Sequence, residues 1–551
     1  MYPIFLIIKG FLSYDLLRGS LFMDFYSEIL GLILSNKIKG KEELHKTKIR
    51  LCKKYKISAI PADSEILARI PDDFSEEEKE LATSILRKKA TRSISGVAVV
   101  AVMTSPAECP HGLCIPCPGG PNSGTPQSYT GHEPAALRAS LNDFDPFLQT
   151  TNRIKQLKAI GHPVDKIDFI VMGGTFTARD PFYQDWFIRR CYDGLNNFDS
   201  KSLGEAKLLN EKTESRCIGL TVETRPDWFR LRHADMALLW GATRVELGVQ
   251  SVFDDLLYNI NRGHTVADSV LATRIAKDSG FKVCFHLMPG LPGSDFDRDV
   301  ECFETVFEDD RFKPDMIKIY PTLTIENTKL FDMWKKGEYN PLSNQEGARL
   351  VARLKTIVPE WVRIQRIQRD VPSQFIDAGV DKSNLRQIVE EEMKKNNWSC
   401  RCIRCRELGH KSLKENISFS EEDVSISAEY YSASDSEEVF VSLVDGKNDA
   451  LVGYLRLRDI SNSHRFELSE NPCMIIRELK VVGRELAIGK KSKKGLQHKG
   501  YGKELISEAE RICREEYDKK HLFVLSGVGV KEYYRNLDFK DKNIYLMKTL
   551  K

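Results

Sequence analysis

Three cysteines on one short loop have the spacing of an iron–sulfur site. Cys109, Cys114 and Cys117 follow the pattern C-x4-C-x2-C in AECPHGLCIPCPGG, directly after an apolar run typical of a strand. Three thiolates from one loop can hold three irons of a 4Fe-4S cluster and leave the fourth iron open to a ligand. Structural zinc is the alternative, but it normally takes four closed ligands, and His111 is the other candidate ligand in this loop. The loop therefore favours iron–sulfur chemistry.

A second cysteine group has the spacing of a zinc site. Cys400, Cys402 and Cys405 form C-x-C-x2-C in SCRCIRCRELGH, and His410 follows. Three thiolates with one further ligand can hold a structural zinc ion in tetrahedral geometry, and such an ion would clamp the segment between two domains. The fourth ligand stays open between His410 and a residue from elsewhere in the chain. Free thiols and an additional redox cluster are the alternatives.

The segment QHKGYG, residues 497–502, is similar to the Q/R-x-x-G-x-G/A loop of GCN5-related acetyltransferases. Glycines let such a loop bend around a pyrophosphate, and backbone N–H groups of the following helix bind the phosphate oxygens. We therefore expect acetyl-CoA here, with its pyrophosphate at Tyr501, Gly502 and Lys503. The preceding strand would pair with the pantetheine arm through its backbone. Its residues are Glu478, Leu479, Lys480 and Val481.

Residues 37–56 form a basic run in a chain that is close to neutral. The run holds nine Lys or Arg against two Glu, whereas the whole chain carries 82 basic and 79 acidic residues and a net charge of +3. A solvated helix face is the ordinary explanation of such a run, and its density makes contact with a nucleic-acid backbone an equal alternative. The nine residues are Lys37, Lys39, Lys41, Lys46, Lys48, Arg50, Lys53, Lys54 and Lys56.

Length and composition indicate a globular chain of three or four domains. With 551 residues, of which 41% are hydrophobic and 29% charged, the chain can bury more than one core. This excludes a disordered, collagen-like or coiled-coil protein, and the near-neutral charge excludes a uniformly basic nucleic-acid binder. Thirteen cysteines that include two tight clusters indicate metal ligands in a reducing, cytoplasmic compartment.

The N-terminal apolar run 4–8 is too short to span a bilayer and lacks the features of a signal peptide. Met23 opens an ordinary amphipathic stretch, so we expect translation to start there and residues 1–22 to be a mis-assigned start. No other segment of the sequence is long and apolar enough to cross a membrane.

Seven apolar runs alternate with helix-length segments between residues 96 and 370. Such alternation predicts a parallel sheet or barrel, in which functional residues gather at the carboxyl ends of the strands. Polar residues follow four of the runs, in GGT, ETRPD, QS and PGLPG. The expected strands are 96–103, 167–172, 217–222, 244–249, 281–288, 315–320 and 361–367. The pattern then changes, and residues 415–551 are predicted to form a self-contained α/β module.

Together these motifs resemble the radical S-adenosylmethionine (SAM) superfamily and, within it, the catalytic subunit of the Elongator complex. The usual superfamily spacing is C-x3-C-x2-C, and the first gap here is one residue longer. In archaea the subunit acts alone as a tRNA carboxymethyluridine synthase. The specific resemblance is carried by CPHGLCIPCPGGP, QSYTGHEP, DPFLQT, VMGGTFTARD, LTVETRPDW, ELGVQS, HLMPGLPG, KIYPTL and RIQRDVPS.

The resemblance implies an α/β fold. It would consist of a partial (β/α) TIM-like radical SAM barrel joined to a GCN5-related (GNAT) acetyltransferase domain, with a helical N-terminal arm. The expected domains are a basic helical tRNA-binding arm (23–90), the barrel (91–394), a Cys-rich zinc linker (395–414) and the acetyl-CoA-binding domain (415–551).

The resemblance also implies sites for the small molecules. SAM would contact Gly173, Gly174, Thr175, Glu223 and Gln250, with structural pairing in the barrel mouth as the alternative for the last two. Lys166 matches the lysine of H-x-V-D-K and would reach acetyl-CoA. Lys318 and Tyr320 point to the same face of their expected strand and are candidate catalytic residues near the substrate, with core packing as the alternative for Tyr320. Tyr534 resembles the tyrosine that faces the thioester sulfur, with the adjacent Tyr533 as second choice and core packing as the alternative for these tyrosines.

The implied activity is carboxymethylation at C5 of the tRNA wobble uridine. A 5′-deoxyadenosyl radical from SAM would abstract hydrogen from the acetyl methyl of acetyl-CoA, and the carbon radical would add to C5 before the thioester is hydrolysed. Expected partners are the tRNA anticodon stem-loop and an electron donor, and a homodimer is one expected state. Two alternatives stay open: a protein lysine acetyltransferase with a structural iron–sulfur site and Glu478 as candidate base, and a tRNA-binding scaffold with degenerate modules.

Overall fold

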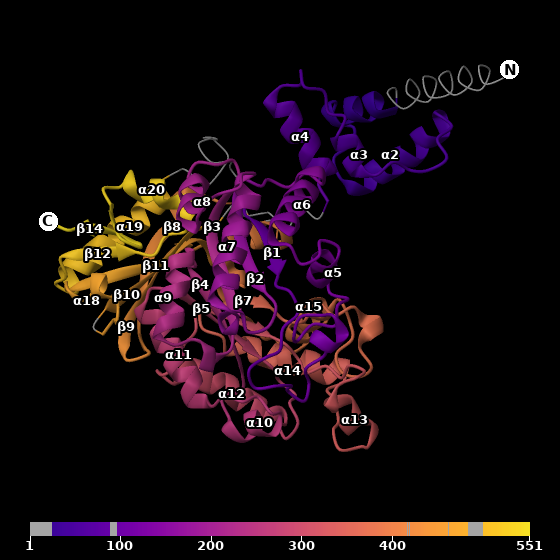
Figure 1. The fold of residues 1–551 in the computed structure, drawn as a ribbon. Helices are drawn as coiled ribbons and strands as arrows, with labels where there is room; N and C mark the ends of the chain where they lie inside the picture. Colours follow the sequence, from indigo (N-terminus) through magenta and orange to yellow (C-terminus); the bar gives the residue numbers. More distant parts are fainter. Residues whose placement is uncertain (1–24, 89–95, 416, 418, 461, 483–499) are drawn as a thin grey trace, which may run out of the picture. The chain divides into compact units, whose positions relative to one another are not determined.

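The computed structural model describes residues 25–88, 96–415, 417, 419–460, 462–482 and 500–551 (Figure 1). The suspected start segment 1–22 and residues 497–499 of the glycine loop lie outside these ranges. The chain forms two compact units. One comprises residues 1–94 and 152–164, and the other comprises residues 95–151 and 165–551.

The first unit is helical in its described part. Residues 25–34 form a helix, followed by α2 (Lys41–Lys54), α3 (Asp63–Leu67) and α4 (Glu76–Leu86). Ser75 caps α4 in a reciprocal pair with Glu78, which satisfies two backbone N–H groups that the helix leaves unpaired. The helices share one apolar core that includes Phe25, Ile29, Leu44, Leu51, Ile66 and Leu86.

The second unit begins with a sheet of seven parallel strands in chain order. All seven predicted strands are confirmed, with ends that shift by a few residues. They are β1 (Ala98–Met103), β2 (Lys166–Met172), β3 (Arg216–Thr224), β4 (Arg244–Gln250), β5 (Lys282–Leu287), β6 (Met316–Ile319) and β7 (Arg363–Arg366). Because consecutive strands are neighbours and the sheet runs from β1 to β7, it is the partial barrel that strand–helix alternation predicts.

Helices connect the strands of this sheet in the sequence, and α7 and α11 pack directly on its strands (Figure 1). The ends of these helices are determined by residues next to them in the sequence, as α7 illustrates. Asp180 caps α7 through its side chain, Pro181 is the first helical residue, and Asn197 ends the helix in the left-handed conformation. The helices are α5 (Pro134–Ser140), α6 (Pro146–Ala159), α7 (Pro181–Asn196), α8 (Leu203–Asn210), α9 (Leu231–Trp240), α10 (Asp254–Asn259), α11 (Val266–Asp278), α12 (Phe296–Glu308), α13 (Lys329–Lys335), α14 (Asn344–Thr356) and α15 (Leu385–Lys395).

A second, mixed sheet has the order β13-β14-β12-β11-β10-β9-β8. Its strands are β8 (Val424–Ala433), β9 (Ser436–Asp445), β10 (Ala450–Ile460), β11 (Cys473–Val481), β12 (His521–Val524), β13 (Lys540–Lys542) and β14 (Tyr545–Thr549). The helix α19 (Tyr501–Arg511) packs on it, and α20 (Lys531–Arg535) follows β12. Strands β11 and β12 run parallel and pair over Cys473–Ile476, and β11 then continues to Val481.

The second sheet has an apolar core of its own, which includes Val441, Leu455, Ile476 and Leu505. It lies in the same compact unit as the barrel, and buried ion pairs join the two sheets. Arg477 of β11 bonds Asp315, just before β6, and Glu438 of β9, both at 2.6 Å. Lys277 of α11 lies 3.0 Å from the same Glu438. Burial raises the pKa of a lone carboxyl group, but Arg477 and Lys277 outweigh burial and lower the pKa of Glu438 to about 2.

Two glycines let the chain before α20 touch the barrel backbone. A Cβ atom on Gly527 would lie 2.1 Å from the carbonyl oxygen of Ile218 in β3, and a Cβ on Gly529 would lie 2.5 Å from the Cβ of Arg216. Real Cβ atoms do not approach backbone this closely, so both positions require glycine for space. The approach places this segment at the amino-terminal half of β3.

We expect Gly527→Ala to destabilise the protein by about 1–3 kcal/mol, because the methyl group must displace backbone in a packed contact. Urea unfolding would measure the change. Gly204→Ala is the matched control, since its Cβ would meet nothing closer than the Ser202 hydroxyl at 3.8 Å. Equal unfolding midpoints for the two variants would contradict the close approach.

Candidate active site

The loop after β1 holds the first cysteine group at the carboxyl ends of the barrel strands. Cys109 and Cys114 are buried, and Cys117 is half-buried. Polar groups approach all three sulfurs. Thr175 Oγ1 lies 3.5 Å from Cys109, and Gln127 Nε2 lies 3.5 Å from Cys117. Cys114 lies 3.0 Å from His111 Nε2 and 3.6 Å from Arg262 Nη1.

The spread of these sulfurs suits a cluster better than a single ion. Tetrahedral zinc would hold its sulfurs about 3.8 Å apart. Within the described residues, Cys109, Cys114 and Cys117 do not form a set whose sulfurs all lie within 4.8 Å of one another. A 4Fe-4S cube binds each thiolate to a different iron, which separates the sulfurs. Burial raises the pKa of Cys109 and Cys114, so these thiols need bound metal or nearby cations such as Arg262 to ionise.

The turn after β2 lies against the cysteine loop. Gly173 and Gly174 have φ values of 123° and 86°, in the left-handed region that favours glycine. A Cβ on Gly173 would meet the Thr104 hydroxyl at 2.2 Å, and a Cβ on Gly174 would lie 3.9 Å from the Cys109 sulfur. The backbone of this turn therefore approaches the cysteines as a SAM-binding turn would.

Gln250 ends β4 close to the same loop. Its φ of 68° is left-handed, and its Oε1 atom is buried without a hydrogen-bond partner in the part of the chain that the structure describes. Arg262, which approaches Cys114, also donates to the Gly248 carbonyl at 2.8 Å. The structure thus brings together Gly173, Gly174, Thr175, Gln250 and the three cysteines.

A buried lysine lies between two carboxylates inside the barrel. Lys318 of β6 lies 3.2 Å from Glu223 at the end of β3 and is in direct contact with Glu246 of β4. Glu246 is fully buried. Burial raises the pKa of Glu246, but the charge of Lys318 and the hydrogen bond from His286 hold it well below its ordinary value. Burial lowers the pKa of Lys318, and the Glu246 carboxylate holds it well above the usual range.

The predicted Tyr320 lies beside this group. Its ring meets the ring of His286 edge to face, with centroids 5.5 Å apart. Tyr129, from the segment after the cysteine loop, donates to Glu223 at 3.1 Å. Lys318 and Tyr320 are therefore brought to the same polar group, which connects to the cysteine loop through Tyr129.

Three charged or titratable residues of this interior were missed from the sequence. His286 of β5 lies 2.8 Å from Glu246, and Arg244 of β4 lies 3.4 Å from the same carboxylate. Asp168 of β2 lies 3.2 Å from Arg244. The register sets Glu223 beside Glu246 and His286 beside Lys318 on adjacent strands. The period-2 polar residues Lys282, Cys284 and His286 within an apolar strand were the available signal.

The acetyl-CoA candidates lie at the opposite, amino-terminal end of the barrel strands. Lys166 is the first residue of β2. Glu478 of β11 accepts from Arg456 at 2.9 Å, and Arg456 in turn donates to the Asp315 carbonyl before β6. Lys480 lies 3.6 Å from Glu407. The cysteine loop and the β11 candidates, including Leu479 and Val481, thus face opposite ends of the barrel.

The predicted pyrophosphate residues begin α19. Tyr501, Gly502 and Lys503 form its first turn. A Cβ on Gly502 would lie 2.6 Å from the hydroxyl oxygen of Tyr533, so this tyrosine covers the helix start. Tyr534 is buried at 6% exposure within the core of the second sheet, whereas Tyr533 is 38% exposed.

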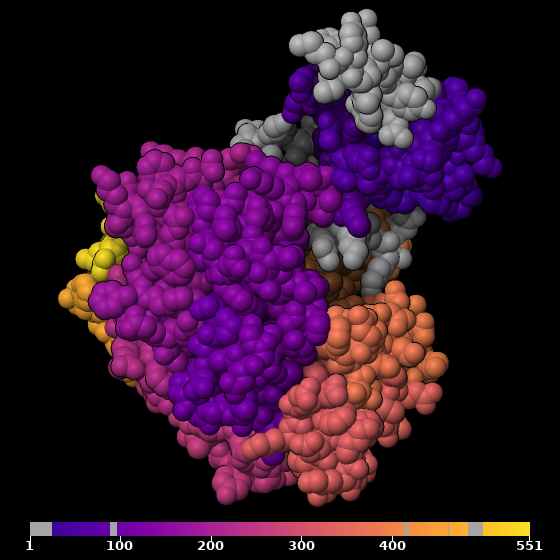
Figure 2. All heavy atoms as spheres, turned by 45° about the vertical axis from the view of Figure 1, so that its right-hand side comes forward, coloured from indigo at the N-terminus to yellow at the C-terminus, as the bar shows by residue number. Residues whose placement is uncertain are grey.

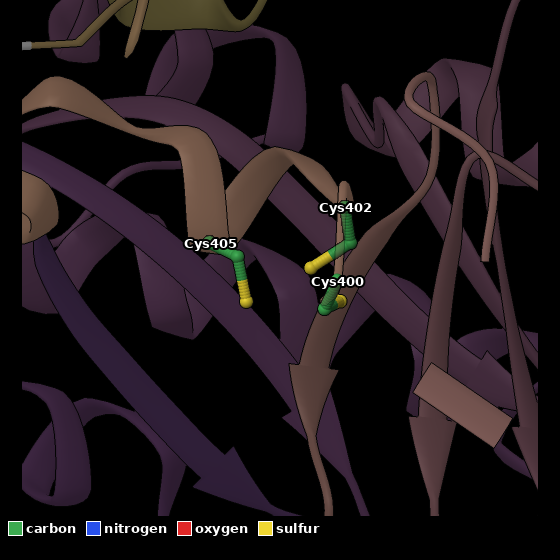
Figure 3. Close-up of side chains that lie close together, drawn as sticks. All are labelled: Cys400, Cys402 and Cys405. Atoms are coloured by element: carbon green, nitrogen blue, oxygen red, sulfur yellow. The ribbon is translucent and has the colours of Figure 1, made fainter. Parts of the chain in front are cut away.

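The second cysteine group is compact (Figure 3). The sulfurs of Cys400, Cys402 and Cys405 all lie within 4.8 Å of one another, as a tetrahedral zinc site requires. No fourth His, Cys, Asp or Glu ligand lies within that distance among the described residues. His410, one of the two possibilities that the sequence left open for the fourth ligand, lies 3.6 Å from Glu407. Hydrogen bonds from the other two cysteines lower the pKa of Cys405, which favours a thiolate there.

Four of the nine basic residues of the N-terminal run are paired with acids. Lys41 and Lys48 both bond Asp63, and Lys48 is buried. Lys46 and Lys54 pair with Glu42 and Glu28. The exposed remainder is Lys37, Lys39, Arg50, Lys53 and Lys56 (Figure 2 shows this unit in indigo). Any contact with a nucleic acid would be made by these five exposed residues.

Comparison with known proteins decides the family. Residues 108–305 match the Radical SAM superfamily, 314–395 the Radical_SAM C-terminal domain and 22–94 the ELP3 N-terminal domain. A protein of Methanocaldococcus jannaschii named tRNA uridine(34) acetyltransferase is 51% identical over 89% of this chain and 90% of its own. The human protein named Elongator complex protein 3 is 41% identical over 98% of this chain and 99% of its own. The chain belongs to the Elongator complex protein 3 family.

A solved structure of the Methanocaldococcus infernus Elp3 with an N-terminal deletion has 46% sequence identity and a TM-score of 0.74, and it covers 83% of this chain and 100% of that one. Membership of the radical SAM superfamily implies a 4Fe-4S cluster and SAM, and the first cysteine loop suits that cluster. In the described part of the chain, no helix has the length and apolar character of a membrane span.

We expect Lys318→Met to cost about 3–5 kcal/mol of unfolding free energy, because it leaves the buried Glu246 carboxylate without its nearest cation. The double variant Lys318→Met/Glu246→Gln should recover much of that loss. Urea unfolding of wild type, both single variants and the double variant measures the coupling. If the losses of unfolding free energy in the two single variants simply add in the double variant, the proposed coupling between Lys318 and Glu246 is wrong. Lys46→Met, which removes an exposed pair, should leave the midpoint near that of wild type.

Proposed function

We propose that this protein carboxymethylates C5 of the wobble uridine of tRNA, with acetyl-CoA as acyl donor and SAM as radical source. The observation that carries the proposal is the cysteine loop beside the buried Lys318 group, in a chain 51% identical to a tRNA uridine(34) acetyltransferase. A base that is unstacked in an anticodon loop can be turned into a protein cavity for chemistry. The charged interior of the partial barrel would supply the polar groups for such a base.

The cysteine loop and its neighbours would hold the radical-generating groups. Cys109, Cys114 and Cys117 would bind the cluster, which supplies the electron that cleaves SAM to a 5′-deoxyadenosyl radical. The turn at Gly173, Gly174 and Thr175 would approach SAM through its backbone, as its close contact with the cysteine loop supports. Glu223 and Gln250 would bind it from the ends of β3 and β4.

Residues 415–551 would form a GNAT acetyl-CoA-binding domain. Parallel β11 and β12 pair over four residues, and β11 then continues to Val481 while paired with β10 alone. The edge of Glu478–Val481 that faces away from β10 would therefore be available to the pantetheine arm. The N–H groups of Tyr501 and Gly502 at the start of α19 suit the pyrophosphate. Lys503, whose N–H donates to the Gly500 carbonyl at 2.8 Å, would bind it through its side chain. Lys166 and Tyr534 would approach the acyl end, whereas Tyr533, whose hydroxyl lies over Gly502, would lie nearer the pyrophosphate.

Lys318 and Tyr320 would act at the uridine. Lys318 is a fixed donor that can bind a uracil carbonyl, and Tyr320 lies beside it. The helical N-terminal arm would bind the anticodon stem-loop through the exposed part of its basic run. A protein lysine acetyltransferase is less well supported, because its candidate base Glu478 is bonded by Arg456 and Tyr454.

The test is a reaction of anaerobically reconstituted protein with dithionite, SAM, methyl-labelled acetyl-CoA and unmodified tRNA. Mass spectrometry of the nucleosides should reveal labelled carboxymethyluridine in wild type and none with Cys114→Ala. Cys191→Ser, which changes a buried cysteine outside both groups, should retain the product. The radical transfer would be refuted if wild type and Cys114→Ala consumed acetyl-CoA equally and neither gave a labelled nucleoside.

The Cys400–Cys405 group would hold structural zinc, with a fourth ligand from outside the trio. We expect one zinc ion per chain in wild type and Cys191→Ser, and none in Cys402→Ser, because two thiolates hold the ion far more weakly. Elemental analysis of purified protein measures this, and thermal unfolding should occur at a lower temperature in Cys402→Ser. Unchanged zinc in that variant would refute the site.

A further inference from the structure

His286 has the geometry of a general base. Its Nε2 lies 2.8 Å from Glu246 Oε2, and Glu246 is held in its ionised form. An ionised carboxylate can only accept a hydrogen bond, so the nitrogen that faces it must carry the hydrogen. Nε2 is therefore the N–H of the neutral ring, and Nδ1 holds the lone pair. Nδ1 has no hydrogen-bond partner among the described residues, and the side chain is 15% exposed. Burial and the charge of Lys318 lower the pKa of His286, which keeps the ring neutral and able to accept a proton.

A metal ion is not needed to explain this cluster. Glu246, Cys284 and His286 each offer a ligand atom within 4.8 Å of the others. However, the Lys318 ammonium contacts the same Glu246 oxygen and already supplies a positive charge there. Burial also holds the Cys284 pKa well above its usual value, so this sulfur is a neutral thiol. The set is therefore a carboxylate–imidazole pair beside an ammonium.

We propose that His286 is the general base that hydrolyses the thioester formed on the uridine, a role that rests on the proposed function. A water molecule would lose a proton to Nδ1 as its oxygen bonds to the thioester carbonyl carbon. The carbon–sulfur bond then breaks, the imidazolium returns its proton to the coenzyme A thiolate, and a carboxymethyl group remains. One water is consumed, one free thiol is released, and no electrons are transferred.

The surroundings favour His286 over the other acids and bases of the barrel. Glu223 and Glu246 are both bonded to Lys318, so neither carboxylate is free to take a proton. The Glu246 carboxylate touches the ring that becomes positive and stabilises the imidazolium. Lys318, the neighbour of His286 in the register of β5 and β6, adds a positive charge that favours the oxyanion of the tetrahedral intermediate.

The experiment compares wild type, His286→Gln and His464→Gln in the labelled reaction. His464 is the matched control, because it also pairs with a carboxylate, Asp235 at 2.9 Å, but lies outside the barrel interior. Three quantities are read by mass spectrometry: 5′-deoxyadenosine, carboxymethyluridine and the coenzyme A thioester of carboxymethyluridine in tRNA. Hydroxylamine converts that thioester to a hydroxamate and identifies it.

With His286→Gln we expect 5′-deoxyadenosine to form, carboxymethyluridine to fall about 100-fold or more, and the thioester to accumulate on tRNA. His464→Gln should match wild type. In His286→Ala, added imidazole should restore carboxymethyluridine, which a merely structural histidine would not allow. If wild type makes carboxymethyluridine and neither His286 variant accumulates the thioester, the role of His286 is refuted. If wild type makes no carboxymethyluridine, the proposed function fails and this role with it.

Discussion

Buried charge between the two sheets is the constraint on which the rest of the structure depends. Asp315 and Glu438 are both buried and share Arg477. A buried carboxylate is stable only while it keeps its cation, because an unpaired one costs several kcal/mol. These pairs fix the second sheet against the amino ends of the barrel strands. The carboxyl ends, with the cysteine loop, must then open on the other side.

That arrangement separates two sets of residues that one reaction would use. The β11 candidates lie near the amino ends, and the cysteines lie at the carboxyl ends. Between them the barrel interior is not filled with the branched apolar side chains that are usual in such barrels. It holds Asp168, Arg244, Glu246 and Lys318 in continuous contact. Burying charged side chains of this kind costs free energy of folding, which argues that they serve the chemistry.

The sequence predicted much of this structure because its signals are local. Apolar runs located all seven barrel strands, and cysteine spacing singled out Cys400, Cys402 and Cys405, whose sulfurs lie within 4.8 Å of one another. What it could not predict depends on register. His286 and Arg244 become partners of Glu246 only once three strands are aligned. In the same way, no local pattern shows that Lys48 is buried against Asp63, or that Tyr533 rather than Tyr534 covers Gly502.

The contact of Gly527 with Ile218 has a consequence for how the chain is made. Gly527, which completes the packing of β3, lies far from Ile218 in the sequence, and contacts of such high sequence separation make folding slow. On the ribosome the barrel strands emerge first, and the Asp315 carboxylate before β6 then still lacks Arg477. The barrel therefore cannot reach its final packing until Gly527 has been synthesised, and a chain truncated after residue 414 would leave the buried Asp315 carboxylate without Arg477.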